Sequence, residues 1–194
     1  MPTKKAPPIY QLKITLLEIE PRIWRRLQVP SSIKLCCLHS ALQVVMGWTD
    51  SHLHQFDQGE KHWGVPEWDE FDEFDLIDES KTRLATVLLG EGESMVYQYD
   101  FGDDWEHEVV LERVISVSDA VKTPICMGGE RRCPPEDVGG VRGYQEFLDV
   151  ILDPTRKEYK QYVRWAGGHF IDTFNVKAVN ESLSYMRWPI RHRR

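Results

Sequence analysis

The amino-acid sequence predicts an α+β protein, with a mainly antiparallel sheet and helices packed on one face or one end of that sheet. Strand-like alternation of apolar and polar residues recurs between residues 9 and 114, interrupted by one strong helical pattern. Further helical patterns follow one another after residue 142. Because strands and helices do not alternate regularly along the chain, a parallel doubly wound sheet is not expected.

Two adjacent strands are predicted at the start of the chain. Residues 9–19 alternate cleanly between apolar and polar side chains, which is typical of a half-buried strand. The dipeptide Glu20-Pro21 ends this pattern, and residues 23–29 predict a second strand that pairs with the first.

A helix is predicted over residues 33–46, where apolar side chains recur on one helical stripe. Ser31 or Ser32 is expected to cap its start, and Gly47 is expected to end it. His39 lies at the margin of the stripe and is expected to be a core-edge histidine with a backbone hydrogen-bond partner.

Two hairpins are predicted in the middle of the chain. The first joins residues 48–56 to residues 61–65 through a turn at 57–60. The second joins residues 94–101 to residues 105–114 and shows the strongest hairpin pattern in the sequence.

Two registers of the second hairpin have different chemical consequences. With a three-residue loop, Phe101 faces Trp105 and Tyr99 faces His107, so that the aromatic side chains share one buried face. With a two-residue loop, Asp100 faces His107 and could orient it for acid–base or metal chemistry. The first register is favoured because the second mixes aromatic and acidic residues on one face.

The remainder of the chain is predicted to be loop and helix. Residues 119–142 are rich in Pro and Gly and are expected to form a loop. Helical patterns follow at residues 143–152, 155–165 and 175–186.

The cysteines do not predict a disulfide framework. Cys36 and Cys37 are adjacent, so they cannot easily bridge each other. Cys126 and Cys133 can approach across the Gly-rich loop, but they lack the C-x₂-C spacing that is typical of a zinc ribbon. Whether these two are free, bridged or metal-bound is left open.

The charge distribution argues against nucleic-acid binding by this chain alone. The sequence has 31 acidic and 24 basic side chains, a formal net charge of −7. Residues 67–79 carry a dense run of acids without a base and are expected to form a mobile acidic insertion, because like charges repel. The rest of the chain shows no broad basic face of the kind that binds a duplex.

Composition and length predict a single domain over residues 1–194, with an ordered core at about 9–186 and short flexible tails. No apolar segment approaches the ~18 residues needed to cross a bilayer, and the N-terminus lacks an apolar signal core. A soluble, cytoplasmic protein without a membrane partner is therefore expected.

His52 and His54 are the sharpest candidate for a divalent-metal site. On a strand the side-chain period is two, so both imidazoles would leave the same face. Two histidines make an incomplete site, and Asp100 or Glu136 is the expected third ligand. Because a neutral imidazole is required, binding should weaken in mild acid. The alternative is a polar strand face with two solvated histidines.

Glu136 also belongs to the segment CPPEDVGG at residues 133–140. Two prolines stiffen the approach to Glu136 and Asp137, and a diglycine lets the chain turn after them. These acids are either a fixed carboxylate pair for a cation or an arginine, or ordinary capping and loop-solvating residues.

Five segments together resemble one known family. They are IWRR at 23–26, GWTDSHLHQF at 47–56, YQYDFGDDWEHEVVLE at 97–112, CMGGERRCPPEDVGGVRGY at 126–144 and WAGGHF at 165–170. Over about residues 9–183 the chain resembles the plasmid open-reading-frame-3 family, root-inducing-plasmid type. The resemblance implies an α+β domain without an established activity, and a transposon-passenger label on some relatives implies mobile-element biology. The family's usual cysteine after the Glu-Asp pair is Val138 here, so a three-cysteine site is not expected.

Three functions remain open on these grounds. The first is a binding or interaction module for an unidentified ligand or protein partner, linked to plasmid or mobile-element biology. The second is a metal-dependent or hydrolytic enzyme that uses His52, His54 and nearby carboxylates. The third is a nucleic-acid accessory factor. Metal analysis separates the first two, and salt-dependent DNA retention tests the third.

Overall fold

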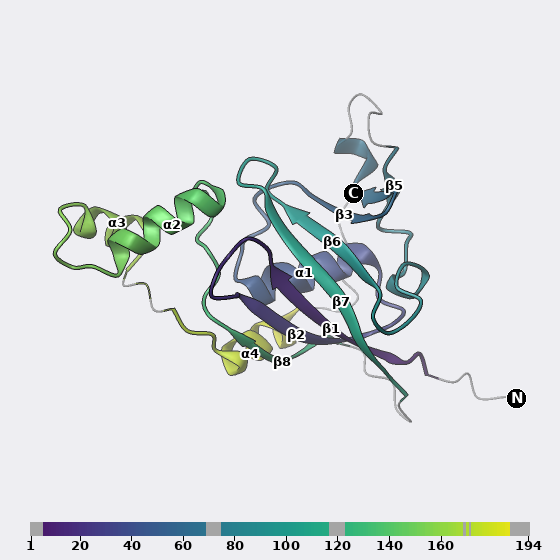
Figure 1. Ribbon diagram of the computed structural model, residues 1–194. Helices are drawn as coiled ribbons and strands as arrows, with labels where there is room; N and C mark the ends of the chain where they lie inside the picture. The colour runs from purple at the N-terminus through teal and green to yellow at the C-terminus, as the bar shows by residue number, and fades with distance from the viewer. Residues whose placement is uncertain (1–5, 69–74, 117–122, 169, 171, 187–194) are drawn as a thin grey trace, which may run out of the picture.

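The computed structural model describes residues 6–68, 75–116, 123–168, 170 and 172–186, and it confirms the α+β class (Figure 1). One eight-stranded sheet has the order β5-β4-β3-β6-β7-β1-β2-β8. Every described strand pair is antiparallel except β4 with β5. The elements are β1 (Ile9–Leu16), β2 (Trp24–Pro30), α1 (Leu35–Met46), β3 (His54–Gln58), β4 (Lys61–Gly64), the short 3₁₀ helix η1 (Pro66–Trp68), β5 (Ile77–Asp78), the 3₁₀ helix η2 (Leu84–Thr86), β6 (Ser94–Tyr99), β7 (Trp105–Ile115), β8 (Ile125–Glu130), α2 (Gly140–Ile151), α3 (Tyr159–Trp165) and α4 (Val176–Tyr185).

The hydrophobic core lies between the sheet and α1, which crosses one face of it (Figure 1). Leu12 and Ile14 of β1 are fully buried in the same core as Leu38 and Leu42 of α1. Burial of each such side chain contributes roughly 1.5–3 kcal/mol to folding, so the alternation in β1 and the stripe on α1 stabilise the same interface.

The other face of the sheet is polar. Gln11, Arg26, Gln28 and Glu112 form a network there, in which Arg26 donates to both carboxylate oxygens of Glu112 at 2.6 and 2.8 Å. An antiparallel sheet with one packed and one polar face explains the clean alternation in the sequence.

The ends of α1 differ in how well they were predicted. Gly47 ends the helix as predicted, with a left-handed φ of 87° and its N–H donated to the Gln43 carbonyl. The predicted cap by Ser31 or Ser32 is wrong, because the helix begins at Leu35 behind Lys34 without a side-chain cap. The Leu35 N–H instead donates to the Thr82 carbonyl, so a tertiary contact replaces the cap.

The second hairpin is confirmed, but its register differs from both of those considered. Tyr99 faces Trp105 and Tyr97 faces His107, a slip of two residues from the favoured register. An even slip keeps every side chain on its predicted face, so Trp105 and His107 are buried as predicted. Phe101, which was expected in the core, is 49% exposed in the loop.

Asp100 is the physical reason for the longer loop. Its φ is 59°, and its Oδ1 accepts the N–H groups of Gly102 and Asp103. Its own N–H donates to the Leu53 carbonyl, and the Asp104 N–H donates to the Asp100 carbonyl at 2.6 Å. This turn ends the ladder before Phe101 can pair with Trp105.

Strand β8 is a correction, because residues 119–142 were expected to be loop. Residues Ile125–Glu130 pair with β2, although Gly128 and Gly129 lie in the strand. A Cβ at Gly129 would stand 2.7 Å from both the Trp24 carbonyl oxygen and the Phe174 ring. Glycine is therefore required by close packing at this point, not by a turn.

The acidic segment 67–79 also needs correction where it is described. Ile77–Asp78 form β5 against β4, and Glu79 is buried. Residues 69–74 of this segment lie outside the described residues, so the expected mobility stays a prediction there. Glu79 is buried because His54 provides a partner, as described below.

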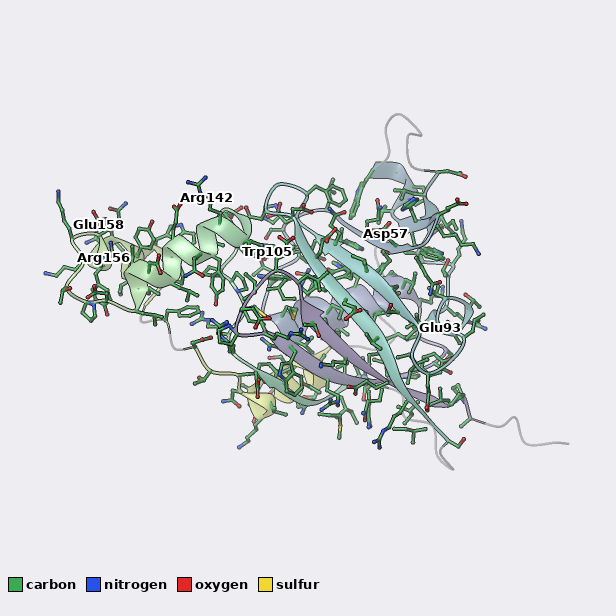
Figure 2. All side chains as sticks on the ribbon, viewed as in Figure 1. Asp57, Glu93, Trp105, Arg142, Arg156 and Glu158 are labelled. Carbon is green, nitrogen blue, oxygen red and sulfur yellow. The ribbon has the colours of Figure 1, made fainter. Side chains whose placement is uncertain are left out.

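The three later helices differ in where they lie relative to the sheet. α4 lies beside β8, and the side chain of Asn180 bonds the Cys126 backbone in both directions at 2.8 Å. α2 and α3 pack on each other and extend away from the sheet (Figure 1). Figure 2 shows Arg142, Arg156 and Glu158 on this extension, whereas Trp105 lies in the body of the sheet.

His107 makes stability depend on pH. Its Nδ1–H donates to the Tyr97 carbonyl, and burial lowers its pKa to about 4. The unfolded chain, with a histidine pKa of ~6.5, takes up this proton at a higher pH than the folded chain. Lowering the pH therefore favours unfolding. The titration of His107 should lower the free energy of unfolding by roughly 2 kcal/mol between pH 7 and pH 5.

Denaturant unfolding at these two pH values measures the effect. The His107→Asn variant, whose amide can donate to the same carbonyl, should show a smaller loss of stability between them. An equal loss in both proteins would exclude His107 as the source.

No helix among the described residues is long and apolar enough to cross a membrane.

Candidate functional site

The segment between α1 and β3 presents polar side chains to two neighbouring groups of titratable residues. Trp48 fixes its start, because the buried indole donates to the Pro134 carbonyl at 2.9 Å and stacks on Tyr99 at 5.0 Å. Asp50 follows with a left-handed φ of 58° and donates its N–H to Gln43 Oε1. The Ser51 N–H donates to Tyr99 Oη.

The first group surrounds His52. Its Nε2 lies 3.2 Å from Asp137 Oδ1, 3.5 Å from Asp100 Oδ2 and 3.9 Å from Glu136 Oε2. This nitrogen is buried, yet it makes no hydrogen bond to any described residue. Three carboxylates thus surround His52 Nε2, but none of their oxygen atoms is placed to form a hydrogen bond with it.

The loops that carry Asp100 and Asp137 contact each other through a hydrogen bond and a close backbone approach. Asp103 Oδ2 accepts the Gly139 N–H, and a Cβ at Gly140 would lie 2.6 Å from the Asp103 carbonyl oxygen. Asp100 and Asp137 both have left-handed φ values, 59° and 56°. Such conformations in non-glycine residues are costly and are enriched at functional sites.

Glu136 is oriented by several donors. Its Oε1 accepts the N–H and the hydroxyl of Thr49, at 2.8 and 3.1 Å. The Tyr99 hydroxyl donates to the same carboxylate. Burial raises the pKa of Tyr99, and the Glu136 charge raises it further, so the phenol stays protonated as a donor.

The second group contains His39, His54, Asp50 and Glu79. The two imidazoles stack with centroids 3.5 Å apart and planes 5° from parallel. His39 Nε2 lies 2.8 Å from Asp50 Oδ1, and His54 Nε2 lies 2.9 Å from Glu79 Oε2. His39, His54 and Glu79 are buried, and His54 Nδ1 finds no hydrogen-bond partner among the described residues.

The hydrogen bonds around His39 define its protonation. Gln43 uses its carbonyl oxygen to accept the Asp50 N–H, so its amide nitrogen donates to Tyr97 Oη. The Tyr97 hydroxyl must then donate to His39 Nδ1, at 2.8 Å. His39 is therefore neutral and donates from Nε2 to Asp50, in agreement with burial, which lowers its pKa.

The second group is poorly suited to hold a metal ion. The lone pairs of two stacked imidazoles lie in parallel planes and do not converge on one point. Both ring nitrogens of His39 are already used by Tyr97 and Asp50. The second group is best described as a buried hydrogen-bonded network.

The structure therefore brings together only part of the predicted metal set. His52, Asp100 and Glu136 meet in the first group, whereas His54 lies in the second. The two histidines separate because β3 begins at His54, so the period-two rule does not extend back to His52. His39 also differs from expectation, since its partners are side chains and not backbone.

Sequence reasoning missed Glu79 and the two tyrosines, Tyr97 and Tyr99. Glu79 was counted with the exposed acids because no local pattern marks it as a partner of His54. Tyr97 and Tyr99 were assigned to the core by alternation, and their hydroxyl groups carry no sequence signal of their own.

A pocket of about 400 Å³ opens beside the first group. It is lined by Asp50, Ser51, His52, Leu53 and Trp68. Among the described residues, His52 of the first group and Asp50 of the second group line this pocket.

Cys126 and Cys133 are free, buried thiols. Cys126 Sγ lies 3.6 Å from the Gly128 carbonyl, and Cys133 Sγ accepts from Arg25 at 3.0 Å. Burial raises the pKa of Cys133 to about 11, so its thiol is a weak metal ligand at neutral pH.

Three comparisons with known proteins cover nearly the whole chain. The family model described as plasmid pRiA4b ORF-3-like protein matches residues 8–182. The uncharacterized protein y4hQ of Sinorhizobium fredii is 35% identical over 193 residues, which cover 96% of this chain and 97% of that protein. The crystal structure of the protein of unknown function MM3350 from Methanosarcina mazei Go1 superposes with a TM-score of 0.79 at 37% identity, covering 89% of this chain and 98% of that one.

Proposed function

Since the chain belongs to the plasmid pRiA4b ORF-3-like family, whose matched relatives have names that state no activity, we propose a function from the candidate site itself. The protein binds a divalent metal ion through His52, Asp100 and Asp137, and Glu136 lies beside these ligands. His54, part of the sequence-based candidate set, is not included because it belongs to the second group.

One observation carries this proposal: the buried Nε2 of His52 faces three carboxylates without a hydrogen bond to any described residue. One donor atom from each of His52, Asp100 and Asp137 lies within 4.8 Å of the others. Donors about 2.0–2.2 Å from a shared ion are separated by up to roughly 4.4 Å, so only a small contraction is required.

The donor set indicates the class of metal. One imidazole with two or three carboxylates suits zinc, manganese or ferrous iron better than calcium, which prefers oxygen donors alone. Asp100 and Glu136 are already oriented by hydrogen bonds on their other sides, which is how outer residues fix metal ligands. A divalent ion would also offset the charge of these carboxylates.

Metal-dependent hydrolysis is the second candidate function, and the pocket beside His52 favours it. With three protein donors, a tetrahedral ion would keep one coordination position for water, and the metal would lower the pKa of such a water toward neutrality. The pocket of about 400 Å³, which His52 lines, would hold a substrate beside the ion. A binding module needs only the metal and the pocket, whereas an enzyme also needs that water.

Removal of the His52 imidazole should strongly weaken metal binding. In calorimetric titration with Zn²⁺ or Mn²⁺, His52→Ala should weaken binding by at least about 100-fold, because loss of a ligand exceeds the effect of losing an outer residue. Affinity should also fall as the pH is lowered, because the ligands must be deprotonated.

His62→Ala is the matched control. His62 is similarly half-buried and lies beside a carboxylate, Asp57, but on the β3–β4 hairpin away from the group. It should leave metal affinity unchanged. Full metal content in the His52→Ala protein, or an equal loss in both variants, would refute the site.

A further inference from the structure

The pocket beside His52 combines exposed apolar side chains with acidic ones. Leu53 is 42% exposed and Trp68 is 46% exposed, and both line the pocket with Asp50. Trp68 packs edge-to-face against His54, with centroids 5.7 Å apart and planes at 85°, so the indole has a defined orientation. Two large apolar side chains at one pocket provide a surface for the organic part of a ligand.

The charge around this pocket is strongly negative. The Asp50 carboxylate lines the pocket, where its Oδ1 lies 2.8 Å from His39 Nε2. Asp100, Glu136 and Asp137 lie 3.2–3.9 Å from His52 Nε2, and none of the described residues that line the pocket is Lys or Arg. A divalent ion at His52 would offset only two of these four negative charges. The pocket therefore stays negative with or without the metal.

An anionic ligand would have to enter against this charge, and only the metal would attract it. A cation is attracted by every carboxylate around the pocket, and the face of a tryptophan is the best aromatic surface for an ammonium or guanidinium group. Electrostatics and the exposed indole thus favour the same ligand class.

We propose that this pocket binds an organic cation, whose ammonium or guanidinium group lies against Trp68 and faces Asp50 while its apolar part contacts Leu53. The inference rests on the proposed function, because it assigns the ligand class of the same site. It places the remainder of the ligand beside the ion held by His52, within reach of that ion's open coordination position.

Two probes of matched shape and opposite charge test the proposal. Phenethylamine and 3-phenylpropionate share the ring and the two-carbon spacer, and calorimetry compares their affinities for the full chain with and without Zn²⁺. The amine should bind at least about tenfold more tightly in both states, and its affinity should fall with added salt. Equal binding, tighter binding of the acid, or binding of neither probe would overturn the proposal.

A pair of tryptophan variants locates the bound amine. Trp68→Ala should weaken amine binding at least about fivefold, because the cation–π contact is lost. Trp165→Ala is the control, since Trp165 is 49% exposed on α3 and does not line the pocket. Both variants remove an exposed indole, so both should fold. An unchanged affinity in Trp68→Ala, or an equal loss in both, would overturn the proposal.

The two proposals fail separately. Preference for the amine in a chain that binds no metal would uphold the cation pocket and refute the metal site. Metal binding that is lost in His52→Ala, together with no preference for the amine, would uphold the metal site and overturn the cation pocket.

Discussion

Replacement of Arg25 by methionine should lower the free energy of unfolding by about 3–5 kcal/mol, the range for removing one partner from a buried charged network. Arg25 is 1% exposed, and its guanidinium lies 3.9 Å above the Phe174 ring. Its nitrogens donate to the carbonyl oxygens of Trp24, Val45, Glu130 and Arg131 and to Cys133 Sγ, at 2.7–3.0 Å. Methionine fills much of the volume but leaves these buried acceptors without donors.

The neighbouring residue provides the control for this prediction. Arg26 points to the polar face of the sheet, where its side chain is 34% exposed and pairs with Glu112. Arg26→Met should cost about 1 kcal/mol or less, because a partly exposed ion pair is screened by water. Urea unfolding of both variants measures the difference, and similar losses would show that the buried hydrogen bonds of Arg25 do not stabilise the fold.

Truncation of Trp105 to alanine should cost about 3–5 kcal/mol, the range for emptying an aromatic core site. The indole is 1% exposed at the start of β7, where Figure 2 labels it, and it stacks on Trp48 with centroids 6.3 Å apart. Trp48 also anchors the segment that leads to His52, so the cavity would adjoin a residue that positions the candidate site. The midpoint of urea unfolding should fall while the slope of the transition stays constant.

Trp165→Ala is the corresponding control on the surface. Its indole touches Phe147 of α2 but is half exposed, so about 1 kcal/mol or less is expected. A loss below about 1 kcal/mol in Trp105→Ala would contradict the burial that the β6–β7 register gives this residue.

The sequence predicted those parts of the fold that rest on local periodicity. Alternation identified β1, β2, β6 and β7, and a helical stripe identified α1, because burial of one face leaves a regular trace. Alternation also placed Trp105 on the buried face despite a register error of two residues. Side chains alternate between the two faces of a strand, so a shift by an even number of residues leaves each side chain on the same face. The register itself depends on the turn at Asp100, whose hydrogen bonds alternation does not report.

The parts that were missed depend on tertiary contacts. β8 contains Gly128 and Gly129, which are typical of loops, and at Gly129 the close approach of Trp24 and Phe174 requires a glycine. In the candidate site, residue type grouped His52, Asp100 and Glu136 as candidate ligands, and the structure places these three side chains close together. The separation of His54 and its pairing with Glu79 depend on where β3 begins and on how the acidic segment ends, and neither has a local signal.

The candidate site is built from segments that are remote along the chain. The hydrogen-bonded residues Thr49 and Glu136 are 87 residues apart, and Tyr99 and Glu136 are 37 residues apart. Contacts of such separation form only after the entropy of closing the intervening loops has been overcome. A chain emerging from the ribosome with β1, β2 and α1 complete would therefore contain His52 but not the carboxylates around it. Binding of a metal ion by this group therefore requires the complete fold, because a partly folded chain does not bring these ligands together.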